Sequence, residues 1–298
     1  MQNGTLSQRS GMTLVFVAGV LWSTVGLGVR FIETAEAWQI LFFRSISLSL
    51  FLVLVIYLMR RKNPLVLASQ MGLNGIIGAL SLVAAYAGGI YSIQATSVGN
   101  AMLLFACAPF MAAILGQLVL GEAVRKETWI AIAVAIIGVL VMVADKFGGT
   151  AIYGNLSAIA SALGFAIFTI TLRRGKSNDM MPVVFLSGLF GLFIMAGICF
   201  AVSLPLVISP KDMGISLSMG VFQVGAGLVL YTLGSRTVPA AELTLLSLAE
   251  VVLGPFWVWL FLGEVLTTNT ILGGIVLLIA ISGNALSGQR RKPPIRLV

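Results

Sequence analysis

Residues 103–122 read LLFACAPFMAAILGQLVLGE, and residues 245–264 read LLSLAEVVLGPFWVWLFLGE. Both stretches begin with two leucines and end with L-x-L-G-E, and the second follows the first after 245 − 103 = 142 positions of a 298-residue chain. Each stretch is apolar over about the 20 residues that a membrane-spanning helix needs. Only the second carries an acid, Glu250, inside its apolar part. The repetition predicts a chain built from two similar halves, one of which has an ionisable group near the middle of a span.

The composition is that of an integral membrane protein. Hydrophobic residues make up 59% of the chain and charged residues only 9%, whereas soluble domains carry about 25% charged residues. Cys107 and Cys199 both fall within apolar runs, which argues against a disulfide framework. Histidine, the commonest metal ligand, is absent from the sequence. The composition therefore predicts a protein of the lipid bilayer that needs no cofactor or metal.

The chain can be divided into apolar runs that are long enough to cross a bilayer. Ten runs are predicted near 12–30, 37–59, 71–93, 98–120, 128–144, 152–172, 181–203, 214–234, 240–262 and 269–286. The junctions QATSVG and SRTVPA are short and weakly polar, so a count of eight or nine spans stays open. The first run has only Arg9 before it and no small-residue cleavage pattern after it, which favours a spanning helix over a signal peptide.

The basic residues test this count, because cytoplasmic loops of membrane proteins are enriched in Lys and Arg. With ten spans and a cytoplasmic N-terminus, the inner side collects Arg9, Arg60, Arg61, Lys62, Arg125, Lys126, Arg173, Arg174, Lys176, Arg236, Arg290, Arg291, Lys292 and Arg296. The outer side collects only Arg30, Lys146 and Lys211. The sorting predicts ten helices with both termini in the cytoplasm. It also explains the net charge of +8 as topology and excludes a nucleic-acid partner.

Each half contains an odd number of predicted helices, so the second half must enter the membrane from the opposite side. The sequence predicts a first five-helix repeat over 12–144, an inverted second repeat over 152–286 and a basic cytoplasmic tail over 287–298. When the halves are superposed, Arg30 meets Arg173 and Asn100 meets Glu242. Inverted repeats in transporters meet near the bilayer midplane, where rocking of one half against the other gives alternating access.

The doubled L-G-E end, each time followed by a short loop and a glycine-bearing helix, resembles the EamA-type members of the drug/metabolite transporter superfamily. The resemblance covers about 12–286 and is nearest to bacterial amino-acid and aromatic-amino-acid exporters. It implies a secondary transporter of a bacterial inner membrane that exports amino acids or related metabolites. One departure is that Pro109 and Pro255 lie six positions apart when the halves are superposed.

An enzyme is not expected. The sequence contains no G-x-x-x-x-G-K-[ST] phosphate loop, no metal-spaced His/Cys cluster and no G-x-S-x-G elbow. ATP is therefore not expected to power transport.

Glu250 is the sharpest candidate for a functional residue. A charge at the centre of a spanning helix costs roughly 2.5–3.5 kcal/mol on insertion scales. The residue is expected to bind a substrate ammonium or to carry a proton, or else to be a buried structural acid bonded to a neighbouring helix. Glu242 and Trp257 share its face, and Glu242 is expected at the inner mouth as a possible gating or structural charge.

Arg44 lies about 10 Å into the run 37–59, at 1.5 Å per residue. The side chain has three possible roles: it binds a substrate carboxylate, reaches the outer interface, or ties helices together. The structural roles are favoured.

Further polar and aromatic residues are expected along the substrate pathway, with helix packing as the alternative for each aromatic residue. These residues are Trp22, Tyr86, Tyr231, Gln223, Trp257 and Asn100. Asn100 opens its run and would otherwise act as a helix cap.

Taken together, the residues predict a secondary transporter of small metabolites with a central cavity between two inverted halves. Export, and amino acids as the first substrates, are what the family resemblance implies. Proton coupling through Glu250 is possible. Two alternatives stay open: a multidrug or lipophilic-cation exporter, and an uncoupled facilitator. The sequence leaves the oligomeric state open.

Overall fold

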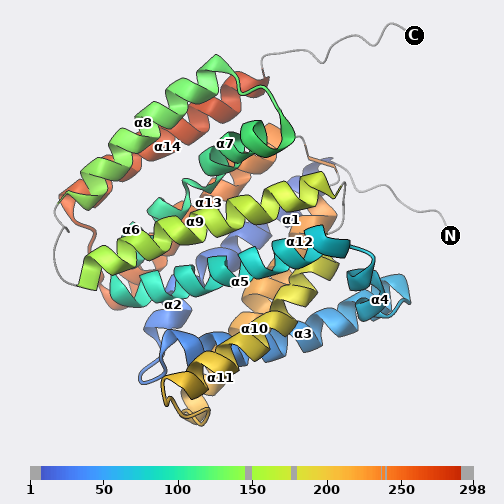
Figure 1. Cartoon of the computed structure of the whole chain (residues 1–298). Coiled ribbons are helices and arrows are strands. Elements are labelled where there is room, and N and C mark those ends of the chain that lie inside the picture. The colour runs from blue at the N-terminus through green and yellow to red at the C-terminus, as the bar shows by residue number, and fades with distance from the viewer. Residues whose placement is uncertain (1–7, 145–149, 176–179, 236, 239, 290–298) are drawn as a thin grey trace, which may run out of the picture.

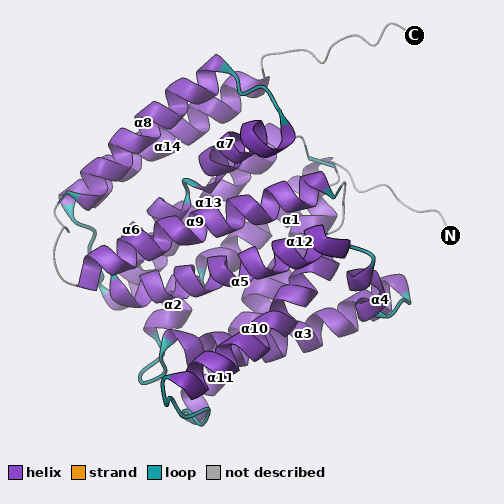
Figure 2. Cartoon of the chain, viewed as in Figure 1, coloured by secondary structure: helices purple, strands orange, loops and turns teal. Residues whose placement is uncertain are grey.

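The computed structural model describes residues 8–144, 150–175, 180–235, 237–238 and 240–289. Within these ranges the protein is helical, without a strand (Figure 2). The elements are α1 Gln8–Ser23, α2 Val25–Arg30, α3 Ala37–Arg60, α4 Pro64–Ser69, α5 Gly72–Ala95, α6 Val98–Phe105, α7 Ala108–Leu120, α8 Lys126–Val143, α9 Thr150–Arg174, α10 Met181–Ala201, α11 Pro210–Ser218, the π-helix η1 Met219–Ala226, α12 Gly227–Gly234, α13 Ala240–Leu262 and α14 Thr268–Gln289.

Nine stretches of the described chain are long and apolar enough to cross a membrane, each matching a predicted run. They are Gln8–Arg30, Ala37–Arg60, Gly72–Ala95, Val98–Leu120, Lys126–Val143, Ala151–Arg174, Met181–Ala201, Pro210–Gly234 and Thr268–Ser287. The remaining predicted run, 240–262, forms α13, but its described apolar part, Ala249–Leu262, is shorter than a span. The helical membrane fold is confirmed, and ten spans with cytoplasmic termini stay a prediction.

The most extensive helix contacts join the first half of the chain to the second. α3 packs on α10, α8 on α14, α5 on α9, and α1 on both α12 and α13. Figure 1 shows α8 beside α14 at one edge of the bundle and α3 beside α10 near the other. The two halves are therefore interleaved, and side chains from both meet in the interior.

The contact between α8 and α14 depends on two glycines. A Cβ added to Gly138 would lie 2.7 Å from the carbonyl oxygen of Gly273, and a Cβ on Gly273 would collide with the carbonyl oxygen of Gly138. Small residues let the backbones of membrane helices approach closely.

Several spans are interrupted. α1 and α2 are separated at Thr24, where the hydroxyls of Ser23 and Thr24 donate to the carbonyl oxygens of Val20 and Leu21 at 2.7 and 2.6 Å. α6 ends at Phe105, and Pro109 stands in the first turn of α7; proline has no N–H to continue a helix ladder. Pro255 instead lies inside continuous α13, so the two L-G-E helices differ in shape.

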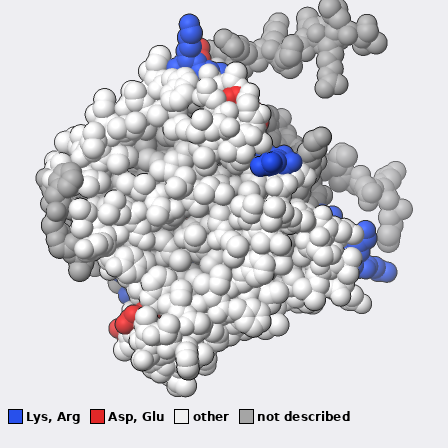
Figure 3. Space-filling view, viewed as in Figure 1, with Lys and Arg blue, Asp and Glu red and all other residues white. Residues whose placement is uncertain are grey.

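The visible face of the molecule is a broad field of uncharged side chains (Figure 3). Lys and Arg side chains appear at its upper, right and lower left margins, and acidic groups lie near its upper and lower left margins. Large apolar side chains such as Leu118 and Phe200 are exposed, as expected for a surface in contact with lipid.

Candidate functional site

Glu250 lies about 15 Å from the start of α13, near its middle. α1 passes close by: a Cβ on Gly19 would lie 3.6 Å from the Leu246 carbonyl oxygen and 3.8 Å from the Glu250 nitrogen. The Glu250 side chain is half-buried. Within the described part of the chain, it has neither a hydrogen-bond donor nor a cation as partner. The structural alternative, an acid bonded to a neighbouring helix, therefore finds no support here.

Aromatic side chains from α1 and α12 meet at Trp22, three residues after Gly19. The rings of Trp22 and Tyr231 lie 5.3 Å apart between centroids, tilted by 40°. The Trp22 side chain packs directly against Gly227, because a Cβ at position 227 would collide with the indole nitrogen. Gln223 donates to the Trp22 carbonyl oxygen at 3.4 Å, while its own buried Oε1 finds no partner among the described residues.

Trp257 connects α13 to the break in the first span. Its Nε1 donates to the Ser23 hydroxyl at 2.9 Å. Trp22, Gln223, Tyr231 and Trp257 thus lie around the same part of α1, and their lining of a substrate pathway stays a prediction.

The π-helix η1 was not predicted from the sequence. A Cβ on its Gly220 would collide with the Ser47 hydroxyl and the Arg44 carbonyl oxygen of α3, so the wide helix depends on a glycine at this contact. Segments of π-helix are rare in proteins, and those that occur often lie at functional sites. The glycines of residues 214–227 indicate close helix packing. They do not distinguish a π-helix from an α-helix.

Arg44 and Tyr86 form a separate pair. The Arg44 guanidinium carbon lies 4.4 Å from the centroid of the Tyr86 ring, and Arg44 is only 3% exposed. Arg44 therefore does not reach the interface, and it contacts α5 through an aromatic ring in place of a carboxylate.

Asn100 is fully buried and donates to the Asn155 side chain of α9. The capping alternative is wrong, because Ser97 is the N-cap of α6 and its hydroxyl accepts from the Asn100 nitrogen at 3.3 Å. The side chain of Glu242 lies outside the described residues.

Two ion pairs link the halves at positions that correspond in the predicted repeats. Arg30 at the end of α2 contacts Glu264 at 2.9 Å, and Arg173 at the end of α9 contacts Glu122 at 2.7 Å. The Arg30 pair is embedded in more bonds: Arg30 donates to the Thr96 carbonyl oxygen at 2.8 Å, and Glu264 accepts from the Val98 nitrogen at 2.8 Å. The Arg30 and Glu264 side chains are 28% and 21% exposed, against 50% and 42% for Arg173 and Glu122.

A buried carboxylate that the sequence analysis missed holds the loop between the first two spans. Asp212 of α11 accepts hydrogen bonds from the backbone nitrogens of Glu33, Thr34 and Ala35 at 3.0, 3.0 and 3.1 Å. The Thr34 hydroxyl donates to it as well, at 2.8 Å. The S-P-K-D run signals a helix start at Ser209, but nothing in it identifies the distant loop.

Replacing Asp212 by alanine is expected to lower the free energy of unfolding by about 3 kcal/mol, because a buried carboxylate that accepts four hydrogen bonds is lost. Asp212→Asn keeps one acceptor oxygen and should lose less. Thermal unfolding of the purified variants measures both. An alanine variant as stable as the wild type would mean that water or the chain replaces the carboxylate at no cost.

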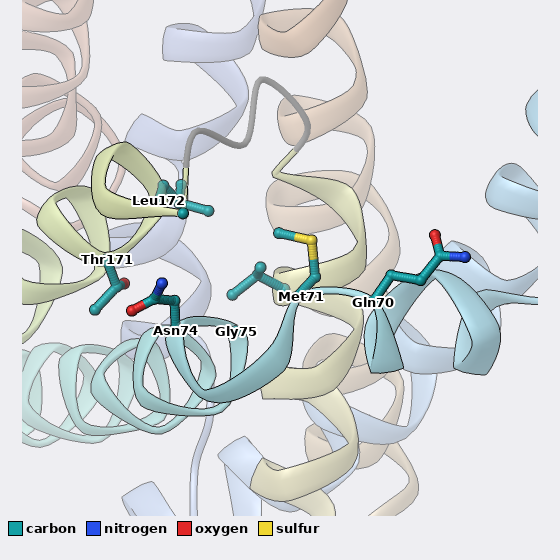
Figure 4. A pocket seen from close by; sticks show the side chains of 8 residues that line it. Gln70, Met71, Asn74, Gly75, Thr171 and Leu172 are labelled. Atoms are coloured by element: carbon teal, nitrogen blue, oxygen red, sulfur yellow. The ribbon is translucent and has the colours of Figure 1, made fainter.

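The described pockets lie away from these residues. One, of about 60 Å³, is lined by Gln70, Met71, Asn74, Gly75, Thr171, Leu172, Gly175 and Val183. In Figure 4 Asn74 and Thr171 point toward one another there, while Gln70 points away. This volume holds about two waters, too little for a metabolite. A wider pocket of about 450 Å³ between α3, α4 and α10 is mostly apolar and includes exposed Leu50, Val53 and Leu65, which suits lipid.

In the described part of the chain, no three His, Cys, Asp or Glu side chains gather as a metal site would require. The candidate site therefore consists of aromatic, amide and single charged groups that suit binding.

Comparison with known proteins adds three findings. The sequence model of the EamA-like transporter family matches residues 9–144 and again residues 152–286. The pseudopaline exporter CntI of Pseudomonas aeruginosa is 26% identical over 289 residues, covering 91% of this chain and 94% of that protein. The protein RarD of Escherichia coli is 28% identical over 173 residues, covering 56% of this chain and 55% of its own.

A solved structure described only as the crystal structure of a protein has a TM-score of 0.66 to this chain, at 16% identity. It covers 96% of this chain and 100% of that one. The likeness supports the same fold over almost the whole length.

Proposed function

The chain belongs to the EamA-like transporter family, and from this premise we propose that it exports small metabolites, amino acids first, by alternating access. Family membership makes it a transporter and not an enzyme, and a multi-pass integral membrane protein. We place it in a bacterial inner membrane, which its resemblance to bacterial exporters supports. One relative carries the name of an exporter, which supports the outward direction.

The observation that carries the substrate class is the state of Glu250. It is a half-buried acid near the middle of α13 with no partner in the described structure. An unpaired carboxylate at this depth is costly unless it is protonated or meets a cation. Nearby Trp22, Tyr231 and Trp257 offer apolar surface with a few polar atoms. An amino acid with its ammonium on Glu250 and its side chain against the aromatic rings suits this arrangement.

Alternating access is supported by the pattern of contacts between the proposed inverted repeats, 12–144 and 152–286. α3 and α10 correspond in the repeats and pack on each other, as do α8 and α14. The Arg30–Glu264 and Arg173–Glu122 pairs correspond as well, and the predicted topology places them at opposite membrane faces. Both pairs are formed in this structure, and breaking one while the other stays formed would open the pathway to one side at a time.

The test is efflux from proteoliposomes preloaded with a mixed set of labelled amino acids, with and without an imposed pH gradient. Saturable loss of some amino acids is the expected result. Loss of lipophilic cations without loss of amino acids would favour a multidrug exporter, for which one acid among aromatic rings is also suited. Flux that never saturates would favour a facilitator.

A further inference from the structure

We propose that Arg44 and Tyr86 form an anion subsite that holds the carboxylate of the transported solute. Arg44 is 3% exposed, and its Nη2 is buried without a hydrogen-bond partner. No ion pair or side-chain hydrogen bond of Arg44 exists within the described residues. A buried cation normally has an anion as partner, because removal from water is costly otherwise.

The surroundings of Arg44 hold it in place without neutralising it. The Tyr86 ring lies 4.4 Å away and attracts the guanidinium through its π face. η1 packs against the Arg44 carbonyl oxygen through Gly220, and α10 packs against Ser45 through Gly191. The backbone around Arg44 is therefore held by η1 and α10, and the guanidinium lies on the Tyr86 ring while its donors remain unused, a preorganised state for binding.

None of the described carboxylates on adjoining elements pairs with Arg44. Asp212 accepts four hydrogen bonds from residues 33–35. Glu36 caps the start of α3 through a capping box, about 12 Å along the helix from Arg44. Glu250 is on α13, which packs on α1. The described chain supplies no counter-ion, which leaves the Arg44 guanidinium free to bind an anion from outside.

The fork of guanidinium donors fits a carboxylate in bidentate geometry. This subsite rests on the proposed function, in which Glu250 takes the ammonium of the same solute. Two opposite charges at separate positions would select zwitterions over amines and over simple cations.

The first experiment measures thermal unfolding of the purified protein with leucine or phenylalanine and with their amides, which keep the ammonium but lack the carboxylate. A ligand that binds the folded state raises the melting temperature. The wild type should respond to the acids and not to the amides, and Arg44→Met should lose the response. An equal response to the amides, or an Arg44→Met variant that responds as the wild type does, would overturn the subsite.

The second experiment needs no ligand. Removing an unpaired buried charge should stabilise the empty protein, so Arg44→Met is expected to raise the melting temperature by about 2–4 °C. The control is Arg30→Met, which removes an arginine that is paired with Glu264 and should therefore lower the melting temperature. An Arg44→Met variant that melts lower, as the control does, would assign Arg44 a structural role. If the wild type responds to no amino acid, the proposed substrate class fails, and this second result alone decides the subsite.

Discussion

Replacing Glu250 by glutamine is expected to abolish the dependence of efflux on a pH gradient while leaving exchange of solute across the membrane. Glutamine keeps the size of the side chain but cannot release a proton. Among the carboxylates whose side chains the structure describes, Glu250 alone lies near the middle of a long helix, α13, without a partner. Gradient-driven efflux should fall by at least about a hundredfold, the lower end of what a positioned proton-transfer group contributes.

The matched control is Glu127→Gln, which makes the same change at an exposed position in the first turn of α8. It should keep the gradient dependence of the wild type. Efflux from preloaded proteoliposomes with an imposed pH gradient measures both variants. If Glu250→Gln keeps the full dependence, Glu250 is not the proton carrier and serves as a cation site or a structural acid.

Breaking the Arg30–Glu264 pair is expected to shift the protein toward states that are open at that end. Glu264 joins the end of α2 to the start of α6, and charge-assisted hydrogen bonds contribute about 1.5–3 kcal/mol. A loss of about 1.4 kcal/mol shifts a conformational equilibrium roughly tenfold. Glu264→Gln should therefore increase the population of that open state by about this factor.

The corresponding ion pair, Arg173–Glu122, provides the control for the Glu264→Gln variant. Arg173–Glu122 is more exposed and has fewer supporting bonds, so Glu122→Gln should have a smaller effect, about 0.5 kcal/mol, in the opposite direction. The readout is thiol labelling of Leu266→Cys, since Leu266 packs against Gly99 beside the Arg30–Glu264 pair, while Cys107 and Cys199 are buried. Equal labelling of Glu264→Gln and wild type would show that the pair does not control opening.

The spans were predictable because hydropathy is a local property. Apolar runs such as 37–59 and 181–203 correspond closely to α3 and α10. The interruptions within the spans were not predictable. They depend on side-chain hydroxyls that bond to backbone carbonyl oxygens, and on contacts between distant parts of the chain. Ser23 and Thr24 bond to carbonyl oxygens of their own helix, and the π-helix η1 lies where Gly220 meets α3.

The site could be predicted only as a set of unusual residues. Hydropathy singles out Glu250 and Arg44 as charges in apolar runs, but whether each has a partner is a three-dimensional property. The sequence topology placed Arg30 and Glu264 on one membrane side, yet their contact joins positions 234 residues apart. The Asp212 contact with Thr34 joins positions 178 apart and left no sequence signal.

The most direct test of the account is solute counterflow in proteoliposomes. Vesicles loaded with a high concentration of unlabelled leucine are diluted into a trace of labelled leucine, and uptake of label is followed with time. A carrier that exposes one zwitterion site alternately to each side predicts a transient accumulation of label above equilibrium, lost in Arg44→Met. Label that only equilibrates, or that fails to enter vesicles containing the wild type, would contradict the account.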